Sequence, residues 1–287
     1  GSSRSAIACS GVAVAQESGA KPTSGERTMG FRLLRHALPA LLLLGAADAG
    51  AVLRADYQFQ GNLNSSVAGA PALANFGAGN AYASESINAG AATVLTFPAG
   101  GGVSLPTATT IIPAGVYSIA ALVRLSDVSG YRKYVDFKNR TSDNGVYVLD
   151  GNLNFYNFAT GAGAPIANNA WRTIVITRDA AGQVAGYVNG APALGFADGS
   201  GAGVVDAANV LNFFFDDAVT GTEQSAGAVA RIQVYDNALS ATEVAGLGLG
   251  PAPALVPALD LRHLVALAGL LAVLGALSLQ LGWVRPK

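Results

Sequence analysis

The feature that most constrains the fold is a series of short runs of alternating apolar and polar residues in the middle of the chain. In residues 117–125, every second residue from Tyr117 to Leu125 is apolar or aromatic, which places these side chains on one face of a strand. Comparable runs occupy residues 52–59, 131–137, 145–149, 152–156, 171–178, 183–188, 210–215 and 229–235. Gly, Asn and Asp separate the runs, and no helical pattern intervenes. We therefore predict an all-β antiparallel sandwich or barrel over residues 52–247.

One short helix is predicted at the end of this domain. Ser240 and Glu243 have the spacing of a capping box, in which each side chain bonds the backbone N–H of the other residue. Residues 244–247 would then form the first turns of the helix. Residues 248–260 are rich in Pro and Gly, and this composition predicts an extended linker.

The sequence around Met29 has the pattern of a secretory signal peptide. Arg32 and Arg35 supply positive charge, residues 38–44 are almost entirely apolar, and small residues follow at 46–51. The apolar run is shorter than the ~20 residues that span a bilayer. We predict a signal peptide over residues 29–51 and a disordered upstream segment, without function, over residues 1–28.

The C-terminal region, residues 261–287, is predicted to be a transmembrane helix. Residues 264–277 are apolar without interruption, and Ser278 and Gln280 are the only polar residues before Trp283. At a rise of ~1.5 Å per residue this stretch crosses a hydrocarbon core of ~30 Å. Trp283 suits the membrane interface, and Arg285 and Lys287 suit the cytoplasmic side.

Three passages resemble the laminin-G-like domains of the concanavalin A-like lectin/glucanase jelly rolls. The first resembles their opening strand, the second their central hairpin, and the third their closing strand and turn. The passages are DYQFQGNLN at 56–64, WRTIVITRD at 171–179 with YVNG at 187–190, and AVARIQVYDNALS at 228–240. This resemblance implies a jelly-roll β-sandwich, a fold that serves many functions.

The C-terminal region also resembles a known class of sequence. Residues 256–259, the hydrophobic stretch and the basic end follow in the order found in bacterial sorting signals of the PEP-CTERM and IPTL-CTERM type. Together with the signal peptide, this resemblance implies an exported protein anchored in the membrane, in the cell envelope or at the cell surface.

Several classes of function are excluded or disfavoured by the residues that the domain lacks. Its basic residues are scattered, whereas nucleic-acid binding requires clustered positive charge. The only histidines, His36 and His263, and the only cysteine, Cys9, lie outside residues 52–247. This placement excludes a catalytic triad with histidine and a zinc site with histidine or cysteine ligands in the domain.

The carboxylates of the domain do not have the spacing of a glycanase of this fold. Such enzymes place paired carboxylates on one strand, and the three glutamates Glu85, Glu223 and Glu243 are far apart in the sequence. Asp216 and Asp217 are adjacent, so on a strand they would point to opposite faces. We therefore predict no catalytic residues and no enzymatic activity.

Two polar loops are candidates for binding calcium, which takes 6–8 oxygen ligands. The first contains Asp216, Asp217 and Glu223, and many laminin-G-like domains bind calcium at a sandwich edge. The second contains Asp143 and Asn144. The alternative for both loops is an ordinary solvated turn, because Asp and Asn stabilise turns by bonding their own backbone.

Aromatic side chains on the surface are candidates for binding sugar. Strand alternation allows Tyr147, Tyr156 and Phe214 to face outward, although aromatic residues of a sandwich more often fill the core. The same alternation places Phe213 and Phe215 together on the opposite face from Phe214. Trp171, Phe213 and Phe215 are predicted in the core.

Taken together, these patterns predict a non-catalytic binding or adhesion module that recognises a glycan or an extracellular protein, with calcium as a possible cofactor. The alternatives are a structural protein of the cell surface or matrix without a specific ligand and, with less support, a glycan hydrolase.

Overall fold

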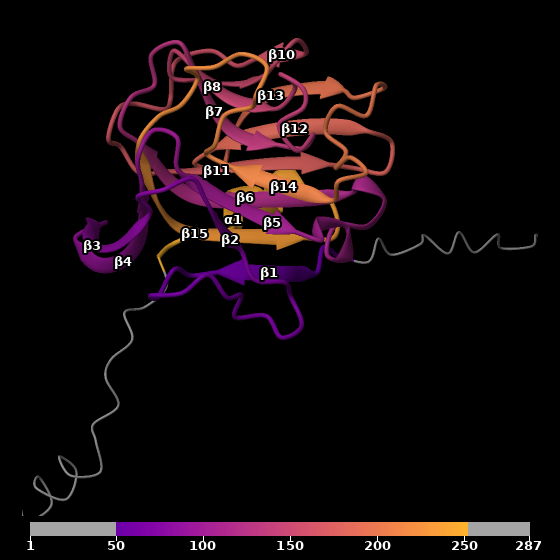
Figure 1. The fold of residues 1–287 in the computed structure, drawn as a ribbon. Helices are drawn as coiled ribbons and strands as arrows, with labels where there is room; N and C mark the ends of the chain where they lie inside the picture. The colour runs from indigo at the N-terminus through magenta and orange to yellow at the C-terminus, as the bar shows by residue number, and fades with distance from the viewer. Residues whose placement is uncertain (1–49, 252–287) are drawn as a thin grey trace, which may run out of the picture. The chain divides into compact units, whose positions relative to one another are not determined.

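The computed structural model describes residues 50–251, and these form two antiparallel β-sheets that face each other (Figure 1). The eight-stranded sheet has the order β13-β12-β11-β6-β15-β4-β3, with β1 also paired to β15. The seven-stranded sheet has the order β10-β9-β8-β7-β14-β5-β2. Every strand pair of the described residues is antiparallel, so the prediction of an all-β antiparallel sandwich is confirmed.

The strands have the following bounds: β1 Leu53–Tyr57, β2 Ala74–Phe76, β3 Ala81–Ile87, β4 Gly90–Phe97, β5 Gly102–Pro106, β6 Tyr117–Leu125, β7 Tyr131–Asp136, β8 Val146–Leu149, β9 Asn152–Phe155, β10 Ala159–Thr160, β11 Arg172–Arg178, β12 Gln183–Val188, β13 Ala191–Ala197, β14 Val210–Phe213 and β15 Gly227–Tyr235. Two short 3-10 helices, η1 Ala108–Thr110 and η2 Pro113–Gly115, precede β6, and the helix α1 covers Ala241–Gly246.

Six strands were not expected from the sequence: β2, β3, β4, β5, β10 and β13. They contain many Gly, Ala, Ser and Thr residues, such as AYASESI in β3 and APALGFA in β13. Small residues give a weak alternation of apolar and polar character, so these segments form strands chiefly because a neighbouring strand pairs with them.

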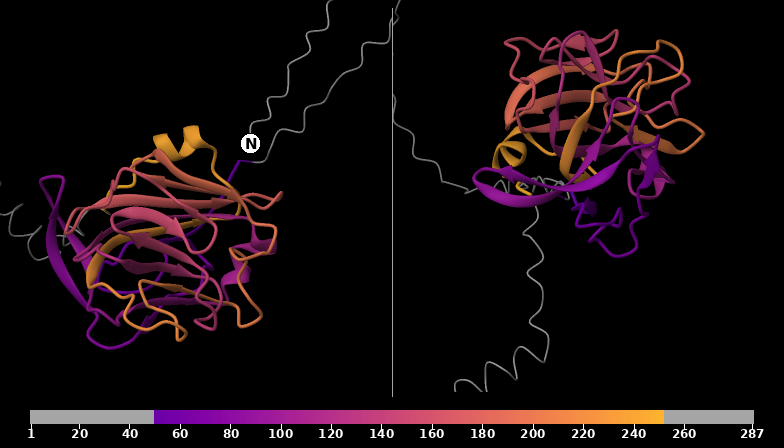
Figure 2. Two further views of the ribbon diagram at one scale, coloured as in Figure 1. Left: turned by 90° about the horizontal axis from the view of Figure 1, so that it is seen from above. Right: turned by 60° about the vertical axis from the view of Figure 1, so that its left-hand side comes forward.

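The main core lies between the two sheets, and a second apolar cluster lies on the outer face of the eight-stranded sheet. Ile119, Ile174 and Ile176 belong to the main core, whereas Ala120, Leu122 and Val175 belong to the second cluster. Residues from α1 and from the hairpin β3–β4 complete the second cluster. Because both faces are covered, nearly every residue of β6 is buried. The hairpin itself projects from one side of the sandwich (Figure 2).

Trp171 was predicted in the core, and that prediction is wrong. It is only partly buried and packs against the second cluster, with the Arg124 guanidinium 5.8 Å from its ring centroid. The reason is its position in the alternation. Trp171 is an even number of residues from Val175, which faces outward, and an odd number from Ile174 and Ile176, which face the core.

The capping box at the start of α1 is confirmed. The Ser240 Oγ accepts a hydrogen bond from the Glu243 N–H, and the Glu243 carboxylate accepts one from the Ser240 N–H at 2.7 Å. The chain between β15 and α1 is attached to β6 by the Ser118 hydroxyl, which accepts a hydrogen bond from the Leu239 N–H at 2.7 Å and donates one to the Asn237 carbonyl at 2.8 Å.

The predicted signal peptide, upstream segment, linker and transmembrane helix lie wholly or mostly outside the described residues. Within residues 50–251, no helix combines the length and the apolar character that crossing a membrane requires. Export and anchoring remain predictions from the sequence.

A glycine in β15 provides a test of the tight contact between neighbouring strands. A Cβ atom at Gly227 would lie 2.4 Å from the Arg124 carbonyl oxygen and 2.7 Å from the Phe97 ring. We expect Gly227→Ala to lower the free energy of unfolding by about 1–3 kcal/mol, because backbone cannot move aside cheaply. Urea unfolding followed by tryptophan fluorescence measures the change.

Gly221→Ala is the matched control, since nothing lies within 4 Å of a Cβ at that position. An unchanged midpoint for Gly227→Ala would show that β15 and β6 separate more easily than this packing implies.

Candidate functional site

Four polar side chains form a row across the outer face of the seven-stranded sheet. Lys133 of β7 pairs with Tyr147 of β8, Tyr147 pairs with Asn154 of β9, and Asn154 pairs with Thr160 of β10. Residues paired in this way share a face of the sheet. The neighbouring residues Val146 and Val148 belong to the main core, so the row lies on the opposite, outer face.

Lys133 is fully buried on this face and is held by charged and polar partners. Its ammonium group lies 2.8 Å from Asp217 Oδ2 and 3.8 Å from Asp136 Oδ2, and it also donates a hydrogen bond to the Tyr147 hydroxyl. It lies 4.1 Å from the centroid of the Tyr147 ring. A buried ammonium without such partners would cost several kcal/mol.

Two loops that are distant in the sequence supply three carboxylates to the same place. Asp143 lies between β7 and β8, and Asp217 and Glu223 lie between β14 and β15. One oxygen from each of the three lies within 4.8 Å of the others. The two loops that the sequence presented as separate calcium candidates therefore form one acidic cluster, defined here as Asp143, Asp217 and Glu223.

Tyr147 joins this cluster to the polar row. Its hydroxyl lies 2.8 Å from Asp143 Oδ1 and 3.0 Å from Asp217 Oδ2, so its single proton can be donated to either carboxylate. Burial, followed by the nearby Asp143 and Asp217, raises the pKa of Tyr147. The hydroxyl consequently stays protonated and remains a donor.

Asp217 uses both of its oxygens within the protein. Oδ1 accepts hydrogen bonds from the N–H groups of Val219 and Thr220 at 2.8 and 3.1 Å, while Oδ2 faces Lys133 and Tyr147. Burial alone would raise the pKa of Asp217, but the hydrogen bonds from Lys133 and the backbone outweigh it and hold the pKa below its usual value. Asp217 is ionised at neutral pH.

Glu223 behaves in the opposite way. Its Oε2 is buried and has no hydrogen-bond partner among the described residues. Loss of solvent, together with the charges of Asp143 and Asp216, raises the pKa of Glu223 to about 7. Its protonation therefore changes in the physiological range.

Of the two remaining calcium candidates, Asp216 lies outside the acidic cluster, and the backbone of Asn144 belongs to a local turn. Asp216 Oδ1 accepts a hydrogen bond from the Asp217 N–H at 3.0 Å, and Oδ2 accepts one from the Glu223 N–H at 2.9 Å. The Asn144 N–H bonds the Ser142 hydroxyl at 3.2 Å. Asp216 and Asn144 thus take part in the turns that position the acidic cluster.

The cluster does not fit a calcium ion in this arrangement. Calcium takes 6–8 oxygen ligands, and the oxygens of Asp217 are already engaged by four donors. The Lys133 ammonium also supplies the positive charge that a cation would bring. Calcium binding stays a prediction, and the geometry weighs against it.

A shallow groove of about 280 Å³ lies beside the acidic cluster. Tyr131, Tyr156 and Phe158 line it with partly exposed rings, and Asn154 and Thr160 line it with polar groups. Tyr131, Tyr147 and Tyr156 pack edge to face, with ring centroids 5.5 to 6.1 Å apart. The negative charge of Asp143 is the first cause of the raised pKa of Tyr156, so this carboxylate is near the groove. We call this the tyrosine groove.

The three aromatic candidates from the sequence have different positions. Tyr156 is partly exposed in the tyrosine groove, as the sugar-binding prediction requires. Tyr147 lies on the predicted outer face but is fully buried, because the acidic cluster and Lys133 cover its hydroxyl. Its ring therefore packs against Tyr131 and Tyr156 and has no exposed face for a sugar.

The prediction that Phe214 faces outward is wrong. Phe214 is 1% exposed and stacks on Phe97 at 4.6 Å in the main core. Its φ of 66° is left-handed, and β14 ends at the preceding residue. The twist breaks the alternation, so Phe213 and Phe214 both turn inward. The core prediction is thereby confirmed for Phe213 and wrong for Phe215, which is left partly exposed beneath Arg140.

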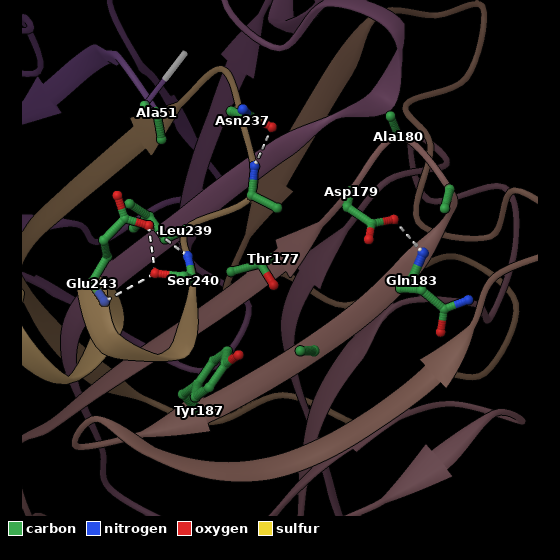
Figure 3. Close-up of a pocket in the computed structure, with 14 residues that line it drawn as sticks. Ala51, Thr177, Asp179, Ala180, Gln183, Tyr187, Asn237, Leu239, Ser240 and Glu243 are labelled. Carbon is green, nitrogen blue, oxygen red and sulfur yellow. Dashed lines mark hydrogen bonds between the residues drawn. The ribbon is translucent and has the colours of Figure 1, made fainter. Parts of the chain in front are cut away.

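A second groove, of about 610 Å³, lies on the outer face of the eight-stranded sheet (Figure 3). Thr177, Tyr187, Gln183 and the start of α1 line it. Several of its polar groups serve local structure: Asp179 accepts from the Gln183 N–H at 2.8 Å, and Ser240 and Glu243 cap α1. It lacks the aromatic cluster and the convergent carboxylates of the tyrosine groove.

The family model of the concanavalin A-like lectin/glucanases superfamily, Laminin_G_3, matches residues 97–245, which is just over half of the chain. The chain belongs to this superfamily. The match covers two of the three passages that indicated the resemblance, those at 171–190 and 228–240, and confirms the resemblance for residues 97–245. No curated protein matches the chain.

Two solved structures illustrate the shared fold. Domain 4 of AbnA, a GH43 extracellular arabinanase from Geobacillus stearothermophilus in complex with arabinotriose, is 16% identical, with a TM-score of 0.53. The match covers 70% of this chain and all of that domain. The binding domain of botulinum neurotoxin serotype C1 is 11% identical, with a TM-score of 0.50, and the match covers 69% of this chain and 51% of the toxin domain. At these identities the likeness shows that the three proteins share a fold, and nothing about their ligands.

Lys133, Tyr131 and Asn154 were not predicted as site residues from the sequence. A detectable signal was present for Lys133, since alternation places it on the same face of the predicted strand as Tyr131, Val135 and Phe137, where a lysine must find a buried partner. Nothing in the sequence indicated that its partner is Asp217, 84 residues away.

The raised pKa of Glu223 predicts a pH dependence of stability. An acid whose pKa is higher in the folded state stabilises the fold at low pH, below its unfolded value near 4.5, and this contribution is lost as the pH rises through about 7. We expect the wild type to lose stability relative to Glu223→Gln as the pH rises from about 4.5 to about 7. Urea unfolding at a series of pH values measures the difference.

Asp179→Asn, on the opposite sheet, is the control and should keep the wild-type pH profile. Parallel profiles for the wild type and Glu223→Gln would mean that Glu223 is as well solvated in the folded state as in the unfolded chain.

Proposed function

We propose that the domain is a non-catalytic carbohydrate-binding module and that the tyrosine groove is its binding site. The observation that carries this proposal is the combination of Tyr131 and Tyr156 with a row of hydrogen-bonding groups. Sugars present apolar C–H faces and polar hydroxyl edges. An aromatic ring packs against the C–H face of a sugar, and the polar groups of Asn154, Thr160 and Asp143 can form hydrogen bonds with its hydroxyls.

A glycan is favoured over a protein partner by the dimensions and the chemistry of the groove. A volume of about 280 Å³ suits a short sugar segment, whereas a stable protein interface buries about 800 Å² on each partner. Domain 4 of the arabinanase, which has the same fold, is known in complex with arabinotriose. That complex is compatible with the proposal, but the support comes from the groove of this chain.

The test is binding of the purified full-length chain to a glycan array. We expect Tyr131→Ala and Tyr156→Ala each to weaken binding by about 0.5–1.5 kcal/mol, roughly two- to twelvefold in Kd. Tyr82→Ala is the matched control, because Tyr82 is 40% exposed but lies on β3 of the other sheet. Binding in the presence of calcium and of a chelator should be equal if Lys133 takes the place of the cation.

Two results would contradict parts of this proposal. Absence of binding to every glycan would favour the alternative of a structural surface or matrix protein. Loss of binding only in chelator would establish a calcium site in the acidic cluster despite the engaged oxygens of Asp217.

One observation favours the alternative of a glycan hydrolase. The oxygens of Asp143 and Glu223 lie within 4.8 Å of each other, and retaining glycosidases hold two carboxyl groups ~5 Å apart, one of them with a raised pKa. This pair has no signature in the sequence, because Asp143 and Glu223 come from different loops and not from one strand. Release of reducing ends from any bound glycan, and its loss in Glu223→Gln, would establish an enzyme instead.

Export and anchoring are further parts of the proposal and rest on the sequence alone. With a signal peptide at residues 29–51 and a hydrophobic helix at residues 261–287, the module would be displayed at the cell envelope or cell surface. We expect the mature N-terminus to lie near residues 49–52. N-terminal sequencing of the protein from the membrane fraction checks this, and recovery of an intact Met29 there would contradict export by cleavage.

A further inference from the structure

The tyrosine groove is lined by one hydrogen-bond acceptor without a protein partner in residues 50–251, the side-chain oxygen of Asn154. Asn154 is 4% exposed, and its Nδ2 donates to Thr160 Oγ1 at 2.7 Å and is near the Ala159 carbonyl at 3.3 Å. Its Oδ1 is buried and has no partner among the described residues. A buried acceptor without a partner costs free energy, so a ligand that donates a hydrogen bond to Oδ1 gains correspondingly.

The charge beside the groove is negative. Asp143, Asp217 and Glu223 converge there, and Lys133 is the only cation that forms an ion pair with this acidic cluster in residues 50–251. Lys133 is fully buried beneath Tyr147 and neutralises Asp217. Asp143 and Glu223 are left partly exposed and without a cationic partner.

Aromatic rings beside carboxylates also attract cations. A cation near the face of a tyrosine ring is stabilised by the π-electrons, and Lys133 already makes this contact with the buried Tyr147 at 4.1 Å. Tyr131 and Tyr156 present the partly exposed members of the same ring cluster on the solvent side.

We propose that the tyrosine groove selects glycans that carry free amino groups, with the sugar ring on Tyr131 or Tyr156 and its ammonium paired with Asp143 and Glu223. This inference rests on the proposed function and names the class of glycan. The ammonium group of an amino sugar is a cation for the carboxylates and a hydrogen-bond donor. The carboxylate of a uronic acid would be repelled by Asp143 and Glu223, and an N-acetyl group is uncharged.

The test compares glycans that differ only in the substituent in question. Glucosamine oligomers, their N-acetylated counterparts and the corresponding glucose oligomers share one backbone, and galactosamine and N-acetylgalactosamine oligomers form a second series. Calorimetric titration of the purified full-length chain should give about tenfold tighter binding for the amino form in at least one series. The gain should shrink as salt is raised from about 50 mM to about 500 mM, since screening weakens partly exposed charge pairs.

Two variants locate the effect. Glu223→Gln and Asp143→Asn keep the shape and an acceptor oxygen, so we expect each to reduce the amino-form preference by about three- to tenfold. Binding of the neutral oligomers to Glu223→Gln should change less than about twofold. Asp179→Asn, on the opposite sheet, is the control and should keep the full preference, and thermal unfolding verifies that every variant is folded.

The possible outcomes separate this inference from the proposed function. Neutral or acetylated oligomers that bind through Tyr156 as tightly as the amino form would overturn the amino-sugar inference and leave carbohydrate binding intact. Amino-form binding that survives in both Tyr156→Ala and Glu223→Gln would place it elsewhere on the surface and overturn the inference as well. If no glycan in the array or in either series binds, both proposals fail.

Discussion

The buried ion pair between Lys133 and Asp217 is the interaction on which the outer face of the seven-stranded sheet depends. Neither partner has side-chain exposure, and each would cost several kcal/mol if left alone out of water. The loop after β14 must therefore close over β7. Backbone hydrogen bonds hold it there, from the Lys133 N–H to the Glu223 carbonyl at 2.9 Å and from the Phe214 N–H to the Tyr134 carbonyl at 3.1 Å. These contacts carry Glu223 toward Asp143.

The partners of the carboxylates around this ion pair explain why the site does not resemble a calcium-binding loop, in which carboxylate oxygens are free to bind the ion. Asp217 is saturated by an internal cation and by backbone donors, while Asp216 holds the turn. The carboxyl groups that remain available belong to Asp143 and Glu223, which lie beside the ring cluster of Tyr131, Tyr147 and Tyr156. Asp216 and Asp217 therefore have structural roles, whereas Asp143 and Glu223 lie beside the groove.

Membership of the concanavalin A-like superfamily determines little about chemistry, because the fold hosts many unrelated functions. The chemistry of this domain is carried by its own side chains, among them the row of polar residues that crosses β7, β8, β9 and β10 on the outer face. The eight-stranded sheet differs, since α1 and the hairpin β3–β4 cover part of its outer face with apolar residues. The two faces of the sandwich are therefore not equivalent surfaces for a ligand.

The sequence by itself determined the all-β class, the antiparallel pairing, the capping box of α1 and the family resemblance, because these follow from local alternation, turn residues and short motifs. It also singled out Asp143, Asp217, Glu223 and Tyr156. Only the tertiary structure decided that the three carboxylates form one cluster, that Lys133 neutralises Asp217, and that a left-handed Phe214 turns its ring into the core. The physical reason is distance along the chain. Alternation describes neighbours within a strand, whereas the cluster depends on strand order and on the closure of two loops 70 or more residues apart.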